Sequence, residues 1–373
     1  MLSALSPIQR IVALAGLVFT IIAGMAQFGG GGEVLRFVLS GLALGALAAV
    51  VGQAIEALGE KLGPSPTALV QSTLGNLPEL FVGIFALRAG LTGVVKAALV
   101  GSVLGNVLLV LGMAFIAGGL RHGTQKFDPE EPRLNATLLL LAVAALLVPT
   151  LAHQLNTPAA SHSGQLSDVT AIVLLVVYAA SVPFYLRRRS AAVHRTVTVG
   201  LPVSPGPSGE AVTSPSDDLA SWPLGLSLAM LAAGSAGAAF VSDWFVAALT
   251  PATHSLGLSQ TFTGLVVVAL ASNAVEHAVG IRFALRAKPE FAISTTLNSP
   301  LQVALLLTPV LVLLSAVVGP SKLTLVFPPL LVAALAVSAV VVVAVIYDGE
   351  YIWLEGVALV GLYFIIAASF WWG

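Results

Sequence analysis

Long apolar runs, separated by short polar, glycine-rich or proline-rich breaks, dominate the sequence. A helix needs about 20 mostly apolar residues to cross the hydrocarbon core of a bilayer, where it satisfies its own backbone hydrogen bonds. Runs of this length predict eleven membrane-spanning helices, at residues 8–27, 33–59, 66–90, 94–119, 134–154, 167–186, 222–249, 259–286, 290–318, 322–347 and 351–371. The pattern therefore predicts an all-α polytopic membrane protein.

The polar breaks also divide the chain into units. The first apolar run contains Arg10 and lacks a clear small-residue cleavage site, so we interpret residues 1–32 as an extra N-terminal transmembrane helix and not as a signal peptide. Residues 187–221 are basic at first and then rich in glycine, proline and serine, which predicts a flexible cytoplasmic linker. The linker separates two predicted transmembrane repeats, 33–186 and 222–373.

The composition agrees with a membrane protein and excludes several other classes. Hydrophobic residues make up 57% of the 373 residues and charged residues 9%, and the mean hydropathy is +0.99, beyond the balance of a soluble domain. A net charge of −1 provides no basic surface for nucleic acid. With no cysteine, a metal site would need oxygen ligands or histidine. Zinc-protease, serine-hydrolase and phosphate-loop motifs are absent from the sequence, so we do not expect an enzyme.

Lysine and arginine predict the orientation in the membrane. With a cytoplasmic N-terminus, only four of the 16 basic residues fall outside, namely Arg36, Arg88, Lys96 and Lys322. This distribution follows the positive-inside rule. No organelle-targeting extension is visible, so we expect a bacterial plasma membrane. The sequence leaves the oligomeric state open, including a homo-oligomer.

The sequence contains an internal repeat of rare polar residues. Displacing the chain by 197 residues aligns three pairs: Asn76 with Asn273, Glu79 with Glu276, and Ser102 with Ser299. An odd number of predicted helices separates the two copies, so the copies have opposite orientations in the membrane. Inverted repeats that meet near the midplane are typical of secondary transporters. We therefore expect two inverted five-helix repeats in addition to the N-terminal helix.

Glu79 and Glu276 are the most informative of these residues. A carboxylate inside a bilayer is costly as an anion, so it must be protonated, paired or bound to a cation. No lysine or arginine is predicted at the same depth. The expected partner is then a proton or a cation, and inverted repeats would bring both carboxyl groups to one site.

Amide and hydroxyl oxygens near the glutamates would complete a cation site. Asn76 and Asn273 each precede a glutamate by three residues and are expected on the same helix face. The next predicted helix of each copy adds further oxygen ligands: Ser102, Asn106, Ser299 and Gln302. Hard oxygen ligands in a flexible arrangement suit Ca²⁺. An isolated asparagine or serine in a membrane helix more often packs against another helix, so the repeated glutamates carry the prediction.

Four further residues are weaker candidates. Pro78 and Pro300 lack an N–H and are expected to leave a backbone carbonyl free in the preceding turn. Glu56 lies near the end of a predicted helix, where it fits either a solvated position or a proton or ion path. His277 follows Glu276 but points elsewhere around the helix, so it is either a proton relay or a packing histidine.

These segments resemble the calcium/cation antiporter superfamily, and specifically its cation/proton exchanger branch. The matching segments are GNLPELFVGIFALRAGLTGVVKAALVGSVLGNVLLVLG, from Gly75 to Gly112, and SNAVEHAVGIRFALRAKPEFAISTTLNSPLQVALLLTPV, from Ser272 to Val310. NAVEH is similar to the proton-exchanging branch, whereas NLPEL is closer to the sodium branch. The sequence departs from the family at 298–300, which reads Asn-Ser-Pro where Gly-Ser-Ser is usual.

The resemblance implies a secondary active transporter in the lipid bilayer that exchanges Ca²⁺ for H⁺ and needs no cofactor. Glu79 and Glu276 would bind either one Ca²⁺ or protons, with alternating access. Na⁺/Ca²⁺ or other cation exchange and a cation channel stay open as alternatives. The missing nucleophile motifs disfavour an intramembrane enzyme, and the paired carboxyl groups disfavour a scaffold. The sequence does not distinguish Ca²⁺ from Mn²⁺, Na⁺ or K⁺ as the substrate.

Overall fold

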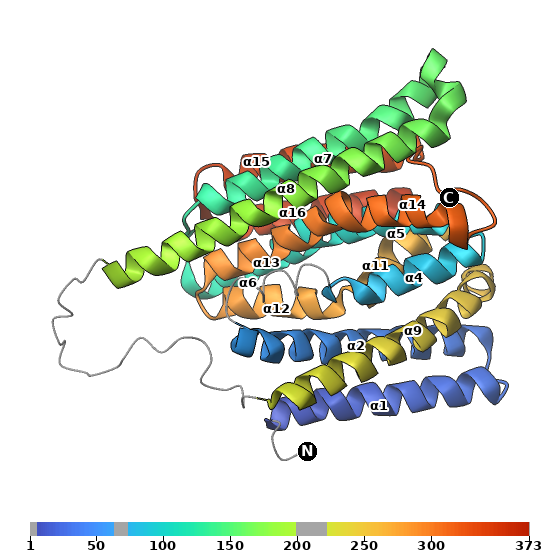
Figure 1. Ribbon diagram of the computed structural model, residues 1–373, viewed down its shortest axis with the longest axis horizontal. Coiled ribbons are helices and arrows are strands. Elements are labelled where there is room, and N and C mark those ends of the chain that lie inside the picture. Colours follow the sequence, from blue (N-terminus) through green and yellow to red (C-terminus); the bar gives the residue numbers. More distant parts are fainter. Residues whose placement is uncertain (1–5, 63–73, 199–221, 373) are drawn as a thin grey trace.

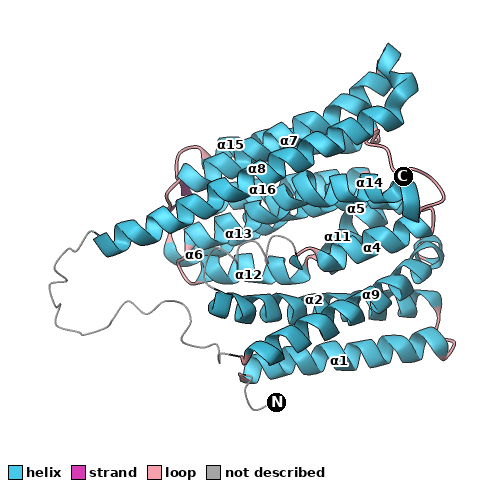
Figure 2. Ribbon diagram, viewed as in Figure 1, coloured by secondary structure: helices cyan, strands magenta, loops and turns pink. Residues whose placement is uncertain are grey.

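The computed structural model describes residues 6–62, 74–198 and 222–372 as an almost entirely helical bundle (Figures 1 and 2). Its elements are α1 (Pro7–Phe28), α2 (Glu33–Leu62), α4 (Leu77–Arg88), α5 (Thr92–Leu104), η2 (Gly105–Val110), α6 (Leu111–His122), β1 (Gln125–Lys126), α7 (Glu130–Gln154), η3 (Pro158–His162), α8 (Ser163–Thr198), α9 (Leu224–Ser255), α10 (Gln260–Phe262), η4 (Thr263–Val268), α11 (Ala269–Ser272), α12 (Ala274–Leu285), α13 (Pro289–Gln302), η5 (Val303–Leu307), α14 (Thr308–Val318), α15 (Pro329–Ile346), β2 (Glu350–Tyr351) and α16 (Trp353–Ser369). The elements η2, η4 and η5 are π-helical segments inside longer helices, and η3 is a 3₁₀ helix.

The predicted fold class is confirmed. Within the described residues, eight helices are long and apolar enough to cross a membrane, or nine if the bent pair formed by Gln260–Ser272 and Glu276–Leu285 counts as one crossing. The apolar helix Trp353–Ser369 is shorter. The first part of the predicted helix 66–90 lies outside the described residues, which resume at 74, so the count of eleven stays a prediction.

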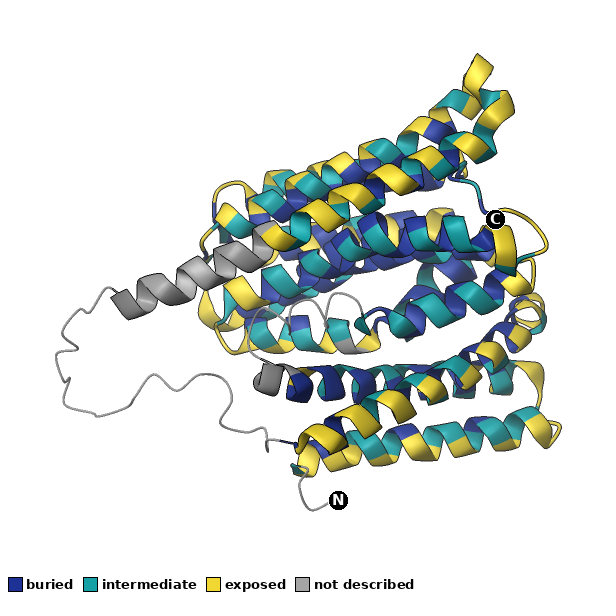
Figure 3. Ribbon diagram, in the orientation of Figure 1, coloured by how far each residue is buried: buried dark blue, intermediate teal, exposed yellow. Residues whose placement is uncertain are grey.

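The helices form three layers that place the polar residues in the middle. Figure 1 shows α1, α2 and α9 on one side, α7, α8 and α15 on the other, and α4, α5, α6, α12, α13 and α14 between them. Packing of α1 on α2 and of α2 on α9 holds the first layer together. Buried residues concentrate in the middle layer, and exposed residues line the outer helices (Figure 3). A polar site in the middle layer is therefore shielded from lipid.

The secondary structure repeats at the same displacement as the sequence. Adding 197 to the bounds of α4 gives the bounds of α12, and adding it to the first residue of α5 gives Pro289, the first residue of α13. The π-helical segments η2 and η5 also correspond, since 105–110 falls on 302–307. Two copies of one local fold therefore surround the middle of the bundle.

A close crossing fixes α5 against η4. A Cβ atom added to Gly101 would lie 2.0 Å from the carbonyl oxygen of Leu265, and one added to Gly264 would lie 2.8 Å from the Ala97 Cβ. Small residues allow membrane helices to approach at backbone distance. This contact sets the position of Ser102, which follows Gly101.

Helix α8 corrects part of the predicted linker. The helix continues to Thr198, so residues 187–198 are helical and not a flexible segment. Arginine and alanine in this segment are good helix formers, so a helix leaving the membrane can continue into water at little cost. The remainder of the predicted linker, 199–221, lies outside the described residues.

Candidate functional site

Two half-helices that begin in the middle of the bundle position the site. Helix α4 begins directly after Asn76 and α12 directly after Asn273. Asn76 has φ −92° and ψ 16°, and Asn273 has φ −106° and ψ 10°, so the chain breaks in nearly the same conformation twice. In Figure 1 the two half-helices lie end to end. Because the Asn273 side chain reaches Glu79, their N-termini face each other.

The break explains the spacing of asparagine and glutamate and corrects one prediction. We expected Asn76 and Glu79 on one face of a continuous helix, with Pro78 freeing a carbonyl. Instead the helix starts between them, and Pro78 lies in its first turn, where a backbone N–H has no partner within the helix. Asparagine followed three residues later by glutamate is a common helix-start pattern. Neither Asn76 nor Asn273 caps its helix with its side chain, so both amides are free to reach across the bundle.

Glu79 is buried and held by the second copy of the repeat. Only 9% of its surface is exposed. Asn273 Nδ2 donates a hydrogen bond to Glu79 Oε1 at 2.5 Å and lies 3.2 Å from the Ser102 hydroxyl oxygen. One amide of the second copy therefore contacts both a carboxyl group and a hydroxyl group of the first.

Glu276 is half-buried and joins the same cluster through hydroxyl and amide groups. The Ser299 hydroxyl donates to Glu276 Oε2 at 2.7 Å. Asn106 Nδ2 donates to the Ser102 carbonyl oxygen at 3.0 Å and lies 3.5 Å from Ser299 Oγ. Asn106 is held in this bridging position by the π-helical segment η2, an irregularity often found at functional sites. Hydrogen bonds thus connect Glu79 to Glu276.

The two copies of the site are not equivalent. Asn76 Nδ2 donates to Gln302 Oε1 at 3.1 Å, whereas Asn273, its counterpart, donates to a carboxyl group. The position that corresponds to Gln302 in the first copy is Gly105, which has no side chain to offer. The structure therefore joins Glu79 and Glu276 through four of the candidates, Ser102, Asn106, Asn273 and Ser299, whereas Asn76 and Gln302 form a separate hydrogen-bonded pair.

Two buried oxygens of the cluster have no hydrogen-bond partner among the described residues: Glu79 Oε2 and Asn106 Oδ1. Buried polar atoms are nearly always paired, so unpaired acceptors indicate a position where a ligand is expected. A carboxylate oxygen and an amide oxygen are both ligands that hard cations prefer. In the described ranges, no three His, Cys, Asp or Glu side chains are arranged so that they could hold a metal ion, so a cation here would rely on the mixed oxygen set.

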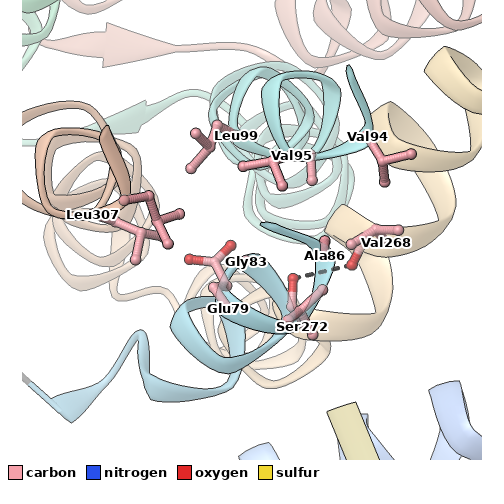
Figure 4. A pocket seen from close by; sticks show the side chains of 12 residues that line it. Glu79, Gly83, Ala86, Val94, Val95, Leu99, Val268, Ser272 and Leu307 are labelled. Carbon is pink, nitrogen blue, oxygen red and sulfur yellow. Dashed lines mark hydrogen bonds between the residues drawn. The ribbon is translucent and has the colours of Figure 1, made fainter. Parts of the chain in front are cut away.

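A small cavity adjoins Glu79, and the glutamate carboxyl group points into it (Figure 4). The cavity follows one face of α4 from Glu79 past Gly83 to Ala86. Its remaining lining comes from α5, η4, α11 and the helix containing η5 and α14, and Ser272 is the only other polar residue among the described lining residues. Among the described lining residues, Glu79 is thus the single ionisable group in an apolar cavity that leads toward the Arg88 end of α4.

Two of the predicted residues lie apart from the hydrogen bonds of the cluster. Glu56 is exposed on α2, whereas the cluster is buried. His277 Nε2 is buried near Gly105, with no hydrogen-bond partner in the described part of the chain. Roles for Glu56 and His277 in a proton path stay predictions.

Ser272, which the sequence reasoning did not single out, lies next to the Asn273 amide at 3.3 Å and lines the cavity. A polar residue directly before Asn273 in an apolar run is the sequence feature that could have identified Ser272 as part of the site.

The sequence profile of one protein family matches most of the chain. The family is described as sodium/calcium exchanger protein, and the match covers residues 33–186 and 226–372. The Ca²⁺/H⁺ antiporter of Synechocystis sp. is 36% identical over 362 residues, which cover 96% of each chain. The Ca²⁺/H⁺ antiporter ChaA of Bacillus subtilis is 33% identical and covers 87% of this chain and 88% of its own.

Solved structures show the same fold. The structure of native YfkE matches with a TM-score of 0.78 at 29% identity, covering 97% of this chain and 99% of that one. The crystal structure of the H⁺/Ca²⁺ exchanger CAX matches with a TM-score of 0.75 at 17% identity, covering 98% and 92% of the two chains. At that identity the second match bears on the fold alone.

Proposed function

We propose that this chain, which belongs to the sodium/calcium exchanger protein family, is a secondary active antiporter that exchanges Ca²⁺ for H⁺. The observation that carries the proposal is the hydrogen-bonded cluster that joins Glu79 and Glu276 and leaves Glu79 Oε2 without a partner in the part of the chain that the structure describes. Relatives named Ca²⁺/H⁺ antiporters match nearly the whole chain, which supports the choice of substrates. The chain is then a transporter and not an enzyme.

Competition for two carboxyl groups would couple the two ions. Glu79 and Glu276, when ionised, carry the charge that balances one dication, and protons neutralise the same groups in its absence. Either loaded form avoids a bare pair of anions inside the membrane, which is the costly state. If only loaded forms change access readily, outward movement of one ion requires inward movement of the other.

The neighbouring side chains would orient the carboxyl groups and supply further oxygens. Asn273 fixes Oε1 of Glu79 and leaves Oε2 without a partner among the described residues, and Ser299 fixes Oε2 of Glu276. Ca²⁺ accepts about six to eight oxygen ligands. The remaining oxygens would come from uncharged candidates: Ser102 and Asn106 of the cluster, and the separate pair Asn76 and Gln302.

We place the site between two inverted repeats, 33–186 and 222–373, in a bacterial plasma membrane with the N-terminus in the cytoplasm. The support is the common displacement of 197 residues that relates α4 to α12 and η2 to η5. Alternating access would expose the cluster in turn at the Arg88 end of α4 and at the Arg282 end of α12. The cavity beside Glu79 lies on the path to the Arg88 end.

Reconstituted transport tests the proposal. We expect Glu79→Gln and Glu276→Gln each to abolish Ca²⁺ flux driven by a pH gradient in proteoliposomes, because a neutral amide can neither balance the dication nor exchange a proton. Glu290→Gln is the matched control, since Glu290 is exposed at the start of α13. Normal flux in either site variant would rule out the assignment.

Na⁺/Ca²⁺ exchange is the second candidate, favoured by the description of the matching family. A sodium gradient imposed at fixed pH separates the two. If the sodium gradient drives Ca²⁺ uptake and the pH gradient does not, the sodium-coupled function is correct. Sustained single-channel currents at fixed voltage would instead indicate a channel.

A further inference from the structure

A cleft lined by basic side chains opens at the end of the bundle where α6 and α12 terminate. Its lining consists of Arg121 and His122 from the last turn of α6, and Arg282, Leu285 and Arg286 from the end of α12. The two helices are distant in sequence but pack against each other. No aspartate or glutamate within residues 6–62, 74–198 and 222–372 lines this basic cleft.

The arginines of the basic cleft have no acidic partner in the described ranges. Arg121, Arg282 and Arg286 are exposed and form no salt bridge there. A basic residue at a helix C-terminus complements the helix dipole, which explains each arginine alone. It does not explain why two helix ends bring three guanidinium groups into one cleft without an acid.

A hydrogen bond fixes the two sides of the basic cleft. His122 Nε2 lies 3.0 Å from the backbone carbonyl oxygen of Leu285, so the end of α6 is tied to the end of α12. The arginines are therefore presented on two joined helix ends and not on independent loops. An anion placed between them would meet donors from both sides.

Apolar surface continues from the basic cleft along the outside of the bundle. Leu285, which lines the cleft, is 36% exposed, and Leu120, next to Arg121, is 67% exposed. The backbone of Trp353 lies against Gly119, and its side chain is 46% exposed. Tryptophan is enriched at the boundary between lipid and water, which places the cleft at headgroup depth. A ligand with an anionic head and apolar tails would match both surfaces.

We infer that the basic cleft binds the phosphate headgroup of an anionic phospholipid, with Arg121, Arg282 and Arg286 as the phosphate ligands. Guanidinium groups donate paired hydrogen bonds to phosphate oxygens, and basic pockets between membrane helices suit such headgroups. The inference goes beyond the proposed function, because the ligand is neither Ca²⁺ nor H⁺.

The position of the basic cleft gives the lipid a role in the site. Helix α12 carries Glu276 in its first turn, and α6 continues from η2, which holds Asn106. A headgroup that bridges the far ends of α6 and α12 restrains both elements together. The bound lipid therefore stabilises the arrangement in which Asn106 and Glu276 share Ser299.

Thermal unfolding of the purified full chain in neutral detergent tests the inference. We expect dioleoylphosphatidylglycerol to raise the unfolding midpoint by at least about 2 °C, since a ligand of the folded state stabilises it. The zwitterionic dioleoylphosphatidylcholine should not. The double variant Arg282→Gln/Arg286→Gln should lose more than half of the shift. Arg88→Gln is the matched control, because Arg88 is an exposed arginine at the opposite end of the bundle.

Three results would overturn the inference: an equal shift with both lipids, a full shift in the double variant, or an equal shift with inorganic phosphate, which would identify a soluble anion as the ligand. If the double variant does not fold, Arg121→Gln and native mass spectrometry of bound phosphatidylglycerol replace it, and unchanged lipid retention would then be decisive. Binding is measured without transport, so Glu79→Gln can fail to carry Ca²⁺ and still bind the lipid.

Discussion

The side-chain amide of Asn273 lies 2.5 Å from Oε1 of Glu79, so the second half of the chain holds the carboxyl group of the first. The two residues are 194 positions apart. Their contact joins the N-terminal ends of α4 and α12 at the centre of the bundle. The position of Glu79 is therefore a property of both halves together.

Removing this contact should weaken Ca²⁺ binding without unfolding the protein. We expect Asn273→Ala to raise the Ca²⁺ concentration for half-maximal flux at least about tenfold, because a hydrogen bond to a charged group contributes about 1.5 to 3 kcal/mol. Titration of Ca²⁺ flux in proteoliposomes measures this concentration. An unchanged thermal unfolding midpoint would show that the variant still folds. Wild-type affinity in Asn273→Ala would mean that the amide does not orient Glu79.

Proton competition should make the apparent Ca²⁺ affinity fall as the pH falls. In the proposed exchange, protons and Ca²⁺ require the same carboxyl oxygens of Glu79 and Glu276, so acid should displace the metal and alkali should restore its binding. The dependence on pH should be steeper in the wild type than in Glu276→Gln, which has one exchangeable carboxyl group fewer. Equilibrium binding of ⁴⁵Ca²⁺ at a series of pH values measures this pH dependence of the affinity for both proteins. An affinity independent of pH would contradict competition.

The close crossing of α5 and η4 predicts a large cost for any side chain at Gly101. A Cβ atom there would lie 2.0 Å from the Leu265 carbonyl oxygen, so the backbone must move. We expect Gly101→Ala to lower the free energy of unfolding by about 1 to 3 kcal/mol. Gly93→Ala, also in α5, is the control, because beyond the neighbouring backbone of α5 no atom of the described residues lies within 4 Å of its added Cβ. Equal thermal unfolding midpoints for Gly101→Ala and Gly93→Ala would contradict the close contact between α5 and η4.

A second polar contact ties α13 to α7 and is predicted to position Ser299. Asn135 Nδ2 donates to Asn298 Oδ1 at 2.9 Å, and Asn298 in turn donates to Ser294 Oγ at 3.2 Å. A double-mutant cycle of Asn135→Ala and Asn298→Ala should give a coupling of about 0.5 to 1.5 kcal/mol in stability. Both single variants should also weaken Ca²⁺ uptake, because Ser299 follows Asn298. A coupling of zero would show that the amides act independently.

Tyr351 predicts a loss of stability at alkaline pH. Its ring stacks on Phe115 at 4.0 Å between centroids, and burial raises the pKa of Tyr351 to about 12. The unfolded phenol ionises near pH 10, so between about pH 10 and 12 only the unfolded state loses the proton and stability falls as pH rises. Tyr351→Phe keeps the stacked ring and should lack this part of the loss. Parallel unfolding midpoints for both proteins over this range would exclude the effect.

The repeated glutamates and the inverted copies were predictable because rare polar residues in apolar runs are conspicuous. The helix breaks are harder to predict, although Asn76 and Pro78 are ordinary helix-start residues. A criterion based on the length of an apolar run ignores where a helix begins, so it predicts continuous helices where the structure has α4 and α12 starting inside the bundle. The π-helical segment around Asn106 has no sequence signal that differs from the surrounding α-helix. The cross-chain contact of Asn273 with Glu79 depends on how two distant segments pack, which periodicity alone does not specify.

If the cluster binds Ca²⁺ as proposed, the meeting of two helix beginnings there limits how tightly it can retain the ion. Each helix N-terminus acts as roughly half a positive charge, and α4 and α12 both direct that end at Glu79 and Glu276. These charges favour the ionised carboxyl groups but repel a dication that sits between them. A pocket made this way is suited to rapid release at each side of the membrane and poorly suited to long-term storage.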